Sequence, residues 1–329
     1  MATNFTVDDL IKDFGNYYLK EGQNMSRLKE TIRQGSETLE RFATPIITEE
    51  SVFRMANPVF QRIMKPFRKA FEPSGGIDFH PNEIILRQCK ADMEVYPTDF
   101  QALWLGFLAG DATKTMETWP IIRYIVEKAI LEQIEEDRET EVVYNGVYDP
   151  DGEQPIDSFD GIKKQLLDGA AHPKYPIHIV KGIGELSKDT IFDQIETYSQ
   201  LLPSLLRKKN MVYFVSDEYE VEFMRSKRAN GFYFISSPDQ IDNRVDFTKH
   251  VVCGLPSMAG TKDLFSTMVP NLLWLKKGVA RSANIDIQKH DRCVHILLDW
   301  WEAVGFACNQ LVWATEHTVK KTDSSGSGS

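Results

Sequence analysis

The sequence lacks the features that would place it in a membrane or in the secretory pathway. No run of about 18 apolar residues occurs in its 329 positions, so no membrane-spanning helix is expected. The first residues are acidic and amphipathic, whereas a signal peptide begins with basic residues followed by an apolar stretch. The four cysteines have no paired spacing, which indicates buried thiols in a reducing compartment. A formal net charge of −10 also argues against a general nucleic-acid binder.

The motifs of common enzyme classes are missing as well. The chain has no G-x-x-x-x-G-K-[ST] loop, no G-x-S-x-G turn, no H-E-x-x-H pair and no C-x-x-C. Gly182 and Gly184 begin like a dinucleotide-binding motif, but Ser187 occupies the third glycine position, so a turn is the better interpretation. Acids and histidines are plentiful, yet no pair is placed as a general acid and base. The chain is therefore not expected to be an enzyme.

One group of residues could hold a metal ion. His290, Cys293 and His295 are close in the sequence, and on a strand Cys293 and His295 would share a face. A tetrahedral zinc site would need a fourth ligand, for which Cys308 and His250 are candidates. Because polar residues on a half-buried strand are far commoner than ligands, neither a metal nor another cofactor is expected.

What the sequence does contain is a long amphipathic helix, predicted over residues 119–145. Apolar residues recur every four positions from Ile122 to Ile134, and charged residues occupy the opposite face. Asn145-Gly146 is predicted to end the helix in a left-handed conformation. Acids crowd the C-terminal half, namely Glu132, Glu135, Glu136, Asp137, Glu139 and Glu141. Because the negative end of a helix dipole disfavours acids, another group is expected to neutralise this end.

Helices and strands intermix along the rest of the chain without regular alternation, which favours an α+β fold. Strands are predicted over residues 77–86, 88–96, 211–215, 232–236, 250–254, 285–288, 294–298 and 308–313. Helices are predicted over residues 5–20, 25–42, 100–108, 190–208 and 217–226, and the one at 190–208 is expected to bend near Pro203. The first two helices fit an arm that needs a partner surface, and a helical hairpin folded on its own domain fits them equally well.

A basic segment precedes the first predicted strand. Residues 58–71 carry Arg62, Lys65, Arg68 and Lys69 with no acid among them, and Pro66 argues against one unbroken helix. Its charge is complementary to that of the acidic half of the long helix.

The order of several local patterns resembles that of the major capsid proteins of tailed bacteriophages, with the Hong Kong 97 phage capsid fold. The matching blocks are Lys90–Pro97, Glu136–Asp137, Asn145–Gly146, Pro155, Gly161–Ile162, Lys209–Ser216 and Gly254–Pro256. Two positions depart from the family pattern: the family's tryptophan is absent from Lys209–Ser216, and Ser257 replaces a valine. The resemblance covers roughly residues 77–315.

The resemblance implies how the subunit is divided. A P-domain would comprise residues 90–147 and 279–319, with a spine helix at about 119–145. An A-domain would span 148–278, after an N-terminal helical arm at 1–50 and an E-loop region at 51–89 with its tip near Gly75-Gly76. Residues 320–329 would form a flexible tail and linker.

The resemblance also implies a function. Members of this family self-assemble through hexamers and pentamers into the icosahedral head of a tailed phage, which encloses double-stranded DNA. The implied partners are other copies of the chain, scaffolding, a portal and packaged DNA, and no membrane. The implied localisation is the virion, after assembly in the cytoplasm of a bacterial host.

We hypothesise that the assembly contacts involve the two complementary charged segments. Arg62, Lys65, Arg68 and Lys69 of one subunit would meet Glu132, Glu135, Glu136 and Glu139 of a neighbour. Two solvated faces that never touch explain the same pattern.

Two other functions remain open at this point. An encapsulin-like compartment would keep the fold and enclose a protein cargo. A cytosolic α+β enzyme that depends on a metal held by His290, Cys293 and His295 would belong to another class.

Overall fold

The computed structural model describes residues 37–60, 64–69, 75–109, 120–229, 243–278, 284–291 and 293–320. The predicted helix at 5–20, most of the one at 25–42, the predicted strand at 232–236, Arg62 and the tail from residue 321 lie outside these ranges. Within them, no helix is both long and apolar enough to cross a membrane.

The first sheet has five strands arranged around one long strand. β11 is 14 residues long and pairs with β10, β4 and β9, while β1 pairs with the outer edge of β9. The bounds are β1 Thr44–Thr48, β4 Arg87–Val95, β9 Leu272–Lys277, β10 Asn284–His290 and β11 Cys293–Phe306. All pairs are antiparallel except that of β1 with β9.

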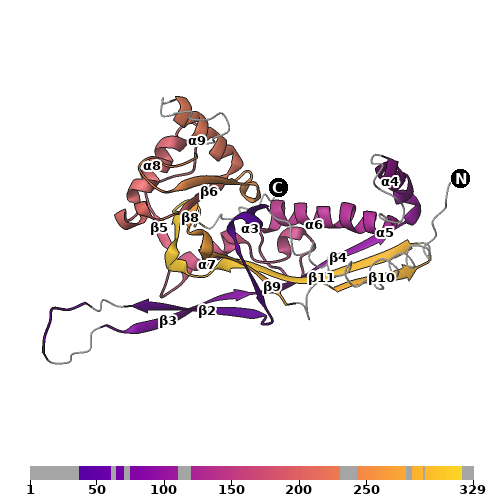
Figure 1. Cartoon of the computed structure of the whole chain (residues 1–329), viewed down its shortest axis with the longest axis horizontal. Coiled ribbons are helices and arrows are strands. Elements are labelled where there is room, and N and C mark those ends of the chain that lie inside the picture. Colours follow the sequence, from indigo (N-terminus) through magenta and orange to yellow (C-terminus); the bar gives the residue numbers. More distant parts are fainter. Residues whose placement is uncertain are drawn as a thin grey trace, which may run out of the picture.

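The second sheet is smaller and mixed, in the order β5-β12-β8-β6-β7. β6 is buried over four of its five residues, as expected for a central strand covered on both faces. The bounds are β5 His178–Val180, β6 Val212–Ser216, β7 Val251–Leu255, β8 Phe265–Thr267 and β12 Val312–Thr315. Two helices, α8 Ile191–Leu201 and α9 Asp217–Ala229, lie over this sheet at one end of the molecule (Figure 1).

A two-stranded hairpin projects from the body of the molecule (Figure 1). β2 Val52–Phe60 pairs with β3 Ile77–Ile85 in antiparallel register, from Val52 opposite Ile85 to Phe60 opposite Ile77. Gly75, just before β3, has a φ of 76°, a left-handed conformation that glycine adopts without strain. The described parts of the basic segment thus belong to a strand and to the loop of a hairpin, and not to a helix.

Two short turns, at neighbouring places, carry the chain directly from one sheet to the other. β8 leads through the turn η7 Val269–Asn271 into β9, and β11 leads through η9 Asn309–Leu311 into β12. Buried Asn271 joins the two passages: its side chain accepts from Cys308 N–H at 2.8 Å and donates to the Cys308 carbonyl at 3.0 Å. As a result β9, from the segment expected for the A-domain, lies in the first sheet, and β12 lies in the second.

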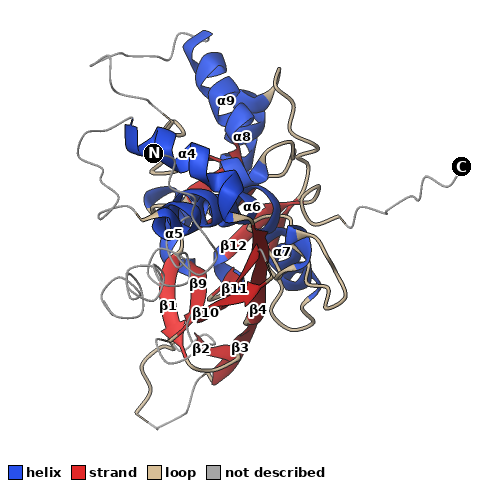
Figure 2. Cartoon of the chain, turned by 90° about the vertical axis from the view of Figure 1, so that its right-hand side faces the viewer, coloured by secondary structure: helices blue, strands red, loops and turns tan. Residues whose placement is uncertain are grey.

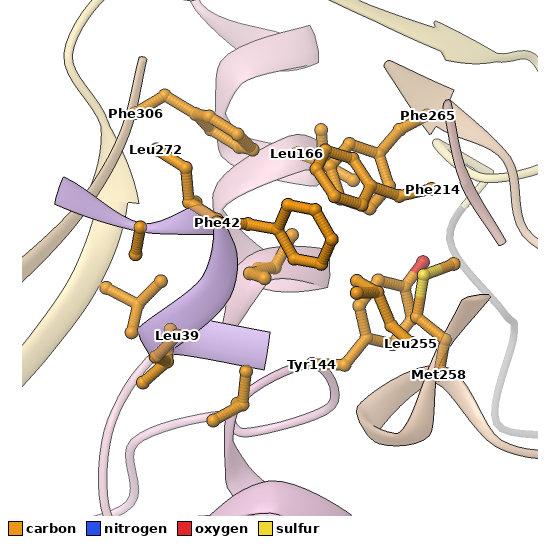
Figure 3. Packing of buried hydrophobic residues seen from close by; sticks show 14 of the residues in the cluster. Leu39, Phe42, Tyr144, Leu166, Phe214, Leu255, Met258, Phe265, Leu272 and Phe306 are labelled. Atoms are coloured by element: carbon orange, nitrogen blue, oxygen red, sulfur yellow. The ribbon is translucent and has the colours of Figure 1, made fainter. Parts of the chain in front are cut away.

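The principal core lies where the two sheets meet (Figure 3). Phe42 from α3 Glu37–Phe42 packs edge-on against Phe214 of β6, with ring centroids 5.1 Å apart. Phe265 of β8 stacks on Phe214 at 4.9 Å and lies edge-on to Phe306 of β11. Side chains from both sheets therefore form one continuous apolar interior.

The predicted long helix is confirmed, and it runs from Ile121 to Val142 in four consecutive parts. These are α5 Ile121–Tyr124, the π-helical η2 Ile125–Ile130, α6 Leu131–Asp137 and the π-helical η3 Arg138–Val142. The helix and α4 Pro97–Ala109 lie on one side of the first sheet, and β2–β3 lie on the other (Figure 2).

The π-helical parts have a physical reason in the sequence. With 3.6 residues per turn, apolar residues spaced by four drift around a regular helix by roughly 40° at each step. The wider π turn reduces that drift, so Ile125, Ile130 and Val142 all stay buried against the core. Sequence periodicity predicts the helix but not this widening.

The prediction of a left-handed stop at Asn145-Gly146 is wrong. Neither residue has a positive φ. Instead the chain returns so that Gly161 N–H donates to the Gly146 carbonyl at 2.9 Å. The next two amides donate to the carbonyls of Val143 and Tyr144, each at 2.9 Å.

Those amides open α7 Ile162–Ala171, so the positive end of α7 abuts the negative end of the long helix. This junction is too close for a side chain. A Cβ on Gly146 would stand 2.5 Å from the carbonyl oxygens of Phe159 and Val142. Glycine is therefore required here for close approach and not for its backbone angles.

Most of the other predicted elements are confirmed within a few residues. The strands predicted at 77–86, 88–96, 211–215 and 250–254 appear as β3, β4, β6 and β7. The helix predicted at 190–208 stops at Leu201, because Pro203 follows, and the chain continues as the 3₁₀ turn η5 Ser204–Lys208. The strand predicted at 308–313 is displaced to β12, after the turn η9. The remaining short 3₁₀ turns are η4 Pro155–Asp157 and η6 Pro256–Met258.

Substitution of Gly146 tests the helix junction. We expect Gly146→Ala to lower the free energy of unfolding by about 1–3 kcal/mol, because the new methyl group must displace backbone atoms. Gly106→Ala in α4 is the control: a Cβ there meets no atom within 4 Å, so stability should rise by up to about 1 kcal/mol. Urea unfolding of the purified chain measures both, and equal effects would contradict the close approach.

Candidate assembly site

The projecting hairpin is fixed at its base. Ile84 of β3 is buried, and it packs so closely on β11 that a Cβ on Gly305 would lie 2.7 Å from its methyl group. The Asn82 amide donates to the Phe306 carbonyl at 2.5 Å and to Asn309 Oδ1 at 3.1 Å. The base of the hairpin is therefore part of the body of the subunit.

The described part of the loop, residues 64–69, has a different character. Met64 and Phe67 are 98% and 90% exposed. Lys65, Arg68 and Lys69 are exposed as well. Two large apolar side chains and three cations thus lie at the end of a projection, where the body of the same chain does not cover them. We call residues 64–69 the hairpin tip.

Acids form a second charged surface on the long helix. Glu132 and Glu136 are exposed, and Glu135 is partly exposed. Burial is the main cause that raises the pKa of Glu135, and the carboxylates of Glu40 and Glu132 raise it further. We call Glu132, Glu135 and Glu136 of the long helix, together with Glu40 of the neighbouring α3, the acidic patch. Its negative charges are close enough to disfavour one another.

Glu139 does not belong to that surface, although the sequence hypothesis includes it. It is buried, and its carboxylate accepts hydrogen bonds from the backbone N–H and the hydroxyl of Thr38 in α3. The Thr38 hydroxyl also lies 3.0 Å from that of Ser257 in η6. The crowded acid is therefore stabilised inside its own chain, so Glu139 is not available to a neighbouring subunit.

The preceding residue, Arg138, forms a buried ion pair with Glu302 of β11. The distance from Arg138 Nε to Glu302 Oε2 is 3.2 Å, and both side chains are almost fully buried. Glu302 also accepts from the indole N–H of Trp274 at 2.6 Å and of Trp300 at 2.9 Å. The sequence gives no sign of this centre, because its members come from the long helix, β9 and β11.

His290, Cys293 and His295, the candidate metal ligands, do come together. Their ligating atoms lie within 4.8 Å of one another at the turn between β10 and β11. These three side chains line an open hollow of about 800 Å³. Glu94, Tyr96 and Asp291 line the same hollow. A hydrogen bond from the Tyr96 hydroxyl is the main cause that lowers the pKa of Glu94. Desolvation and then Glu94 raise the pKa of Cys293.

The two residues predicted as a fourth ligand do not join this cluster. His250 is buried beside the second sheet, where Nδ1 lies 2.5 Å from the Tyr213 hydroxyl and Nε2 lies 3.0 Å from the Leu206 carbonyl. Cys308 lies at the passage between the sheets, bonded to Asn271. Sequence reasoning missed Glu94, because only the pairing of β4 with β11 brings it to the turn.

The hairpin tip and the acidic patch lie far apart within one chain. Figure 1 shows the hairpin tip at one extreme of the long axis, while α6 lies beyond the middle of the molecule. A contact between them can therefore form only between two copies.

Comparison with solved structures decides what kind of fold this is. A chain of the satellite phage P4 procapsid, which includes the size determination (Sid) protein, aligns with a TM-score of 0.53 at 13% identity. The alignment covers 90% of this chain and 98% of that one. A chain of the capsid of an empty GTA particle aligns with a TM-score of 0.52 at 11% identity, over 86% and 96% of the two chains.

The chain has the fold of phage capsid proteins. No protein-family model matches the sequence, and no curated protein matches it. The likeness is therefore one of architecture, and the capsid fold extends over nearly the whole chain.

Within this capsid fold, the Arg138–Glu302 pair can be tested by removing one charge. Glu302→Gln should lower the free energy of unfolding by about 3–5 kcal/mol, because it leaves the Arg138 guanidinium buried without a counter-ion. Glu83→Gln is the control, since it breaks the exposed 2.8 Å pair with Arg54 and should cost at most about 1 kcal/mol. Denaturant unfolding gives both values. If both variants lost a similarly small free energy of unfolding, burial of the Arg138 guanidinium would not require the Glu302 carboxylate as its counter-ion.

Proposed function

We propose that the chain is a shell protein that self-assembles through hexamers and pentamers into the icosahedral head of a tailed phage, enclosing double-stranded DNA. The observation that carries the proposal is the capsid fold over nearly the full length of this chain and of the chains aligned with it. The GTA capsid is described with C5 symmetry. A five-fold arrangement requires contacts between unlike surfaces of identical subunits.

The hairpin tip supports this use of the fold. An isolated two-stranded ribbon is marginally stable in water, so an exposed one gains stability when it lies on another surface. Met64 and Phe67 would be withdrawn from water by such a contact. The occupant we propose is a second copy of the chain, because a heterologous contact repeated around a ring closes a shell.

The acidic patch is the proposed receiving surface. Burial is the main cause that raises the pKa of Glu135, and the carboxylates of Glu40 and Glu132 add to it. Cations from the hairpin tip of a neighbour would relieve the repulsion between these carboxylates. Each exposed pair contributes at most about 1 kcal/mol. Many such contacts, repeated over a closed particle, nevertheless act together.

The sheets would then correspond to the parts named in the family. We assign the first sheet with the long helix to the P-domain, the second sheet with α8 and α9 to the A-domain, and the β2–β3 hairpin to the E-loop. The acidic overall charge, with 48 acids against 38 lysines and arginines, suits a container that releases DNA, because a negative surface limits the affinity that counterion release provides. Scaffolding and a portal would be further partners.

The central test is whether the purified chain forms particles. Size-exclusion chromatography followed by negative-stain microscopy should show rings or hollow particles much larger than the 37.7 kDa chain. Double-stranded DNA in particles isolated from cells that carry the phage would support the head function. A protein cargo in place of DNA would contradict it and favour a compartment, and a compact monomer under all assembly conditions would contradict both.

Charge reversal tests the proposed contact. Lys65→Glu, Arg68→Glu and Lys69→Glu together should abolish particles, because acids would then face acids. The free energy of unfolding of the monomer should change by less than about 0.5 kcal/mol, since the three side chains are exposed. Particle yield by light scattering and chemical denaturation give the two readings.

Two matched variants show whether charge is the cause. Lys65→Arg, Arg68→Lys and Lys69→Arg preserve the positive charge and should preserve particles. Adding Glu135→Lys and Glu136→Lys to the reversed hairpin tip should restore assembly, while Glu132 keeps its 2.7 Å pair with Lys128. Normal particles from the reversed triple variant, or failure of the rescue, would exclude this pairing and leave the shell function to be judged by microscopy.

A further inference from the structure

The register of three strands gathers four potential metal ligands on one face of the first sheet. His290 is directly opposite Cys293 across the two-residue turn that joins β10 to β11. His295 follows Cys293 by two positions, so its side chain points to the same face. Glu94 of β4 is directly opposite His295. The backbone pairing alone therefore brings two imidazoles, a thiol and a carboxylate together.

The side chains are already close to the geometry that zinc requires. Ligating atoms of His290, Cys293 and His295 lie within 4.8 Å of one another, and the two imidazole rings stack with centroids 4.8 Å apart. In a tetrahedral site, Zn–N distances near 2.0 Å and Zn–S near 2.3 Å place ligand atoms about 3.3–3.6 Å apart. The ligand atoms of His290, Cys293 and His295 would therefore approach one another by up to about 1.5 Å to enclose an ion.

The turn itself is constrained. Asp291 has a φ of 51°, the left-handed conformation that a tight two-residue hairpin turn requires. The Cys293 thiol donates to the His290 carbonyl at 3.0 Å. The open hollow in front of the cluster gives an ion access from solvent.

Glu94 is held in a position to complete the set. The Tyr96 hydroxyl donates to Glu94 Oε1 at 2.5 Å, which orients the carboxylate. Such outer hydrogen bonds are a regular part of protein metal sites. With a thiolate and a carboxylate, the four ligands would carry two negative charges, which balance those of a divalent cation.

We propose that His290, Cys293, His295 and Glu94 bind one zinc ion, which joins the β10–β11 turn to the end of β4. Imidazole and thiolate ligands favour zinc over magnesium or calcium. The ion is structural in this proposal, because four protein ligands close a tetrahedral shell. The site is independent of the proposed shell function and of the hairpin tip.

Cobalt is the probe that reports the ligands directly. The full chain, treated with a chelator and kept unassembled, is titrated with Co²⁺ and then with Zn²⁺. We expect one Co²⁺ per chain, visible bands of a tetrahedral ion and a thiolate-to-cobalt charge-transfer band, all removed by one equivalent of Zn²⁺. Cys293→Ser should lose the charge-transfer band.

The affinity series assigns the other ligands. Loss of a residue that only hydrogen-bonds to a metal ligand weakens metal binding by roughly 10–100-fold. Loss of a ligand itself, in His290→Ala, His295→Ala or Glu94→Gln, should therefore lower zinc affinity at least tenfold. Cys308→Ser is the matched control and should bind like the parent, because Cys308 lies at the passage between the sheets. The Cys293→Ser protein must show the parental circular dichroism for its result to count, and His295→Gln provides a second variant if it does not.

Each result of these cobalt and zinc titrations either supports or overturns the proposed zinc site. A Co²⁺ complex without a charge-transfer band, zinc affinity unchanged in Cys293→Ser, or equal weakening by Cys308→Ser would each overturn the site. Retention of the charge-transfer band in Glu94→Gln with weaker binding would support Glu94 as the fourth ligand. Unchanged affinity in Glu94→Gln would exclude it from the set.

Discussion

Two buried charged residues at adjacent positions, Arg138 and Glu139, fix the position of the long helix relative to both sheets. Arg138 pairs with Glu302 in the first sheet, while Glu139 accepts hydrogen bonds from Thr38, whose hydroxyl contacts Ser257 at the end of the second. A buried ion pair often adds little net stability, because desolvation offsets the attraction. We expect its main effect to be specificity, because a rotated or shifted helix would separate Arg138 from Glu302.

Sequence periodicity predicted those parts of the fold that depend on local pattern. The long helix, α4 and β4 appear where apolar spacing placed them. Three features could not be predicted from local pattern, because each depends on atoms far away in the sequence. They are the π-helical parts, the return of the chain at Gly161 and the passage of strands between the sheets. The sequence correctly predicted that another group neutralises the acid-crowded helix end. Part of that neutralisation comes from the same chain, through Thr38 and the N-terminus of α7.

The same division holds for the candidate sites. Alternation along a strand correctly placed Cys293 and His295 together, and the two-residue turn brought in His290. Glu94 could not be predicted, because about 200 residues separate it from its partner on β11 and only strand pairing joins them. The exposed charges of the hairpin tip were predictable as charges, but the projection that presents them is a property of the fold.

The length of β11 has a mechanical consequence. At roughly 3.3 Å per residue its 14 residues extend for about 45 Å, from the His290 turn to the second sheet. A force that pulls the two ends of the subunit apart therefore acts parallel to this strand. It loads the hydrogen bonds of the β4 and β10 ladders together in shear, and does not open them one after another. The first sheet is consequently stiff along β11, because extension in that direction must break many hydrogen bonds at once.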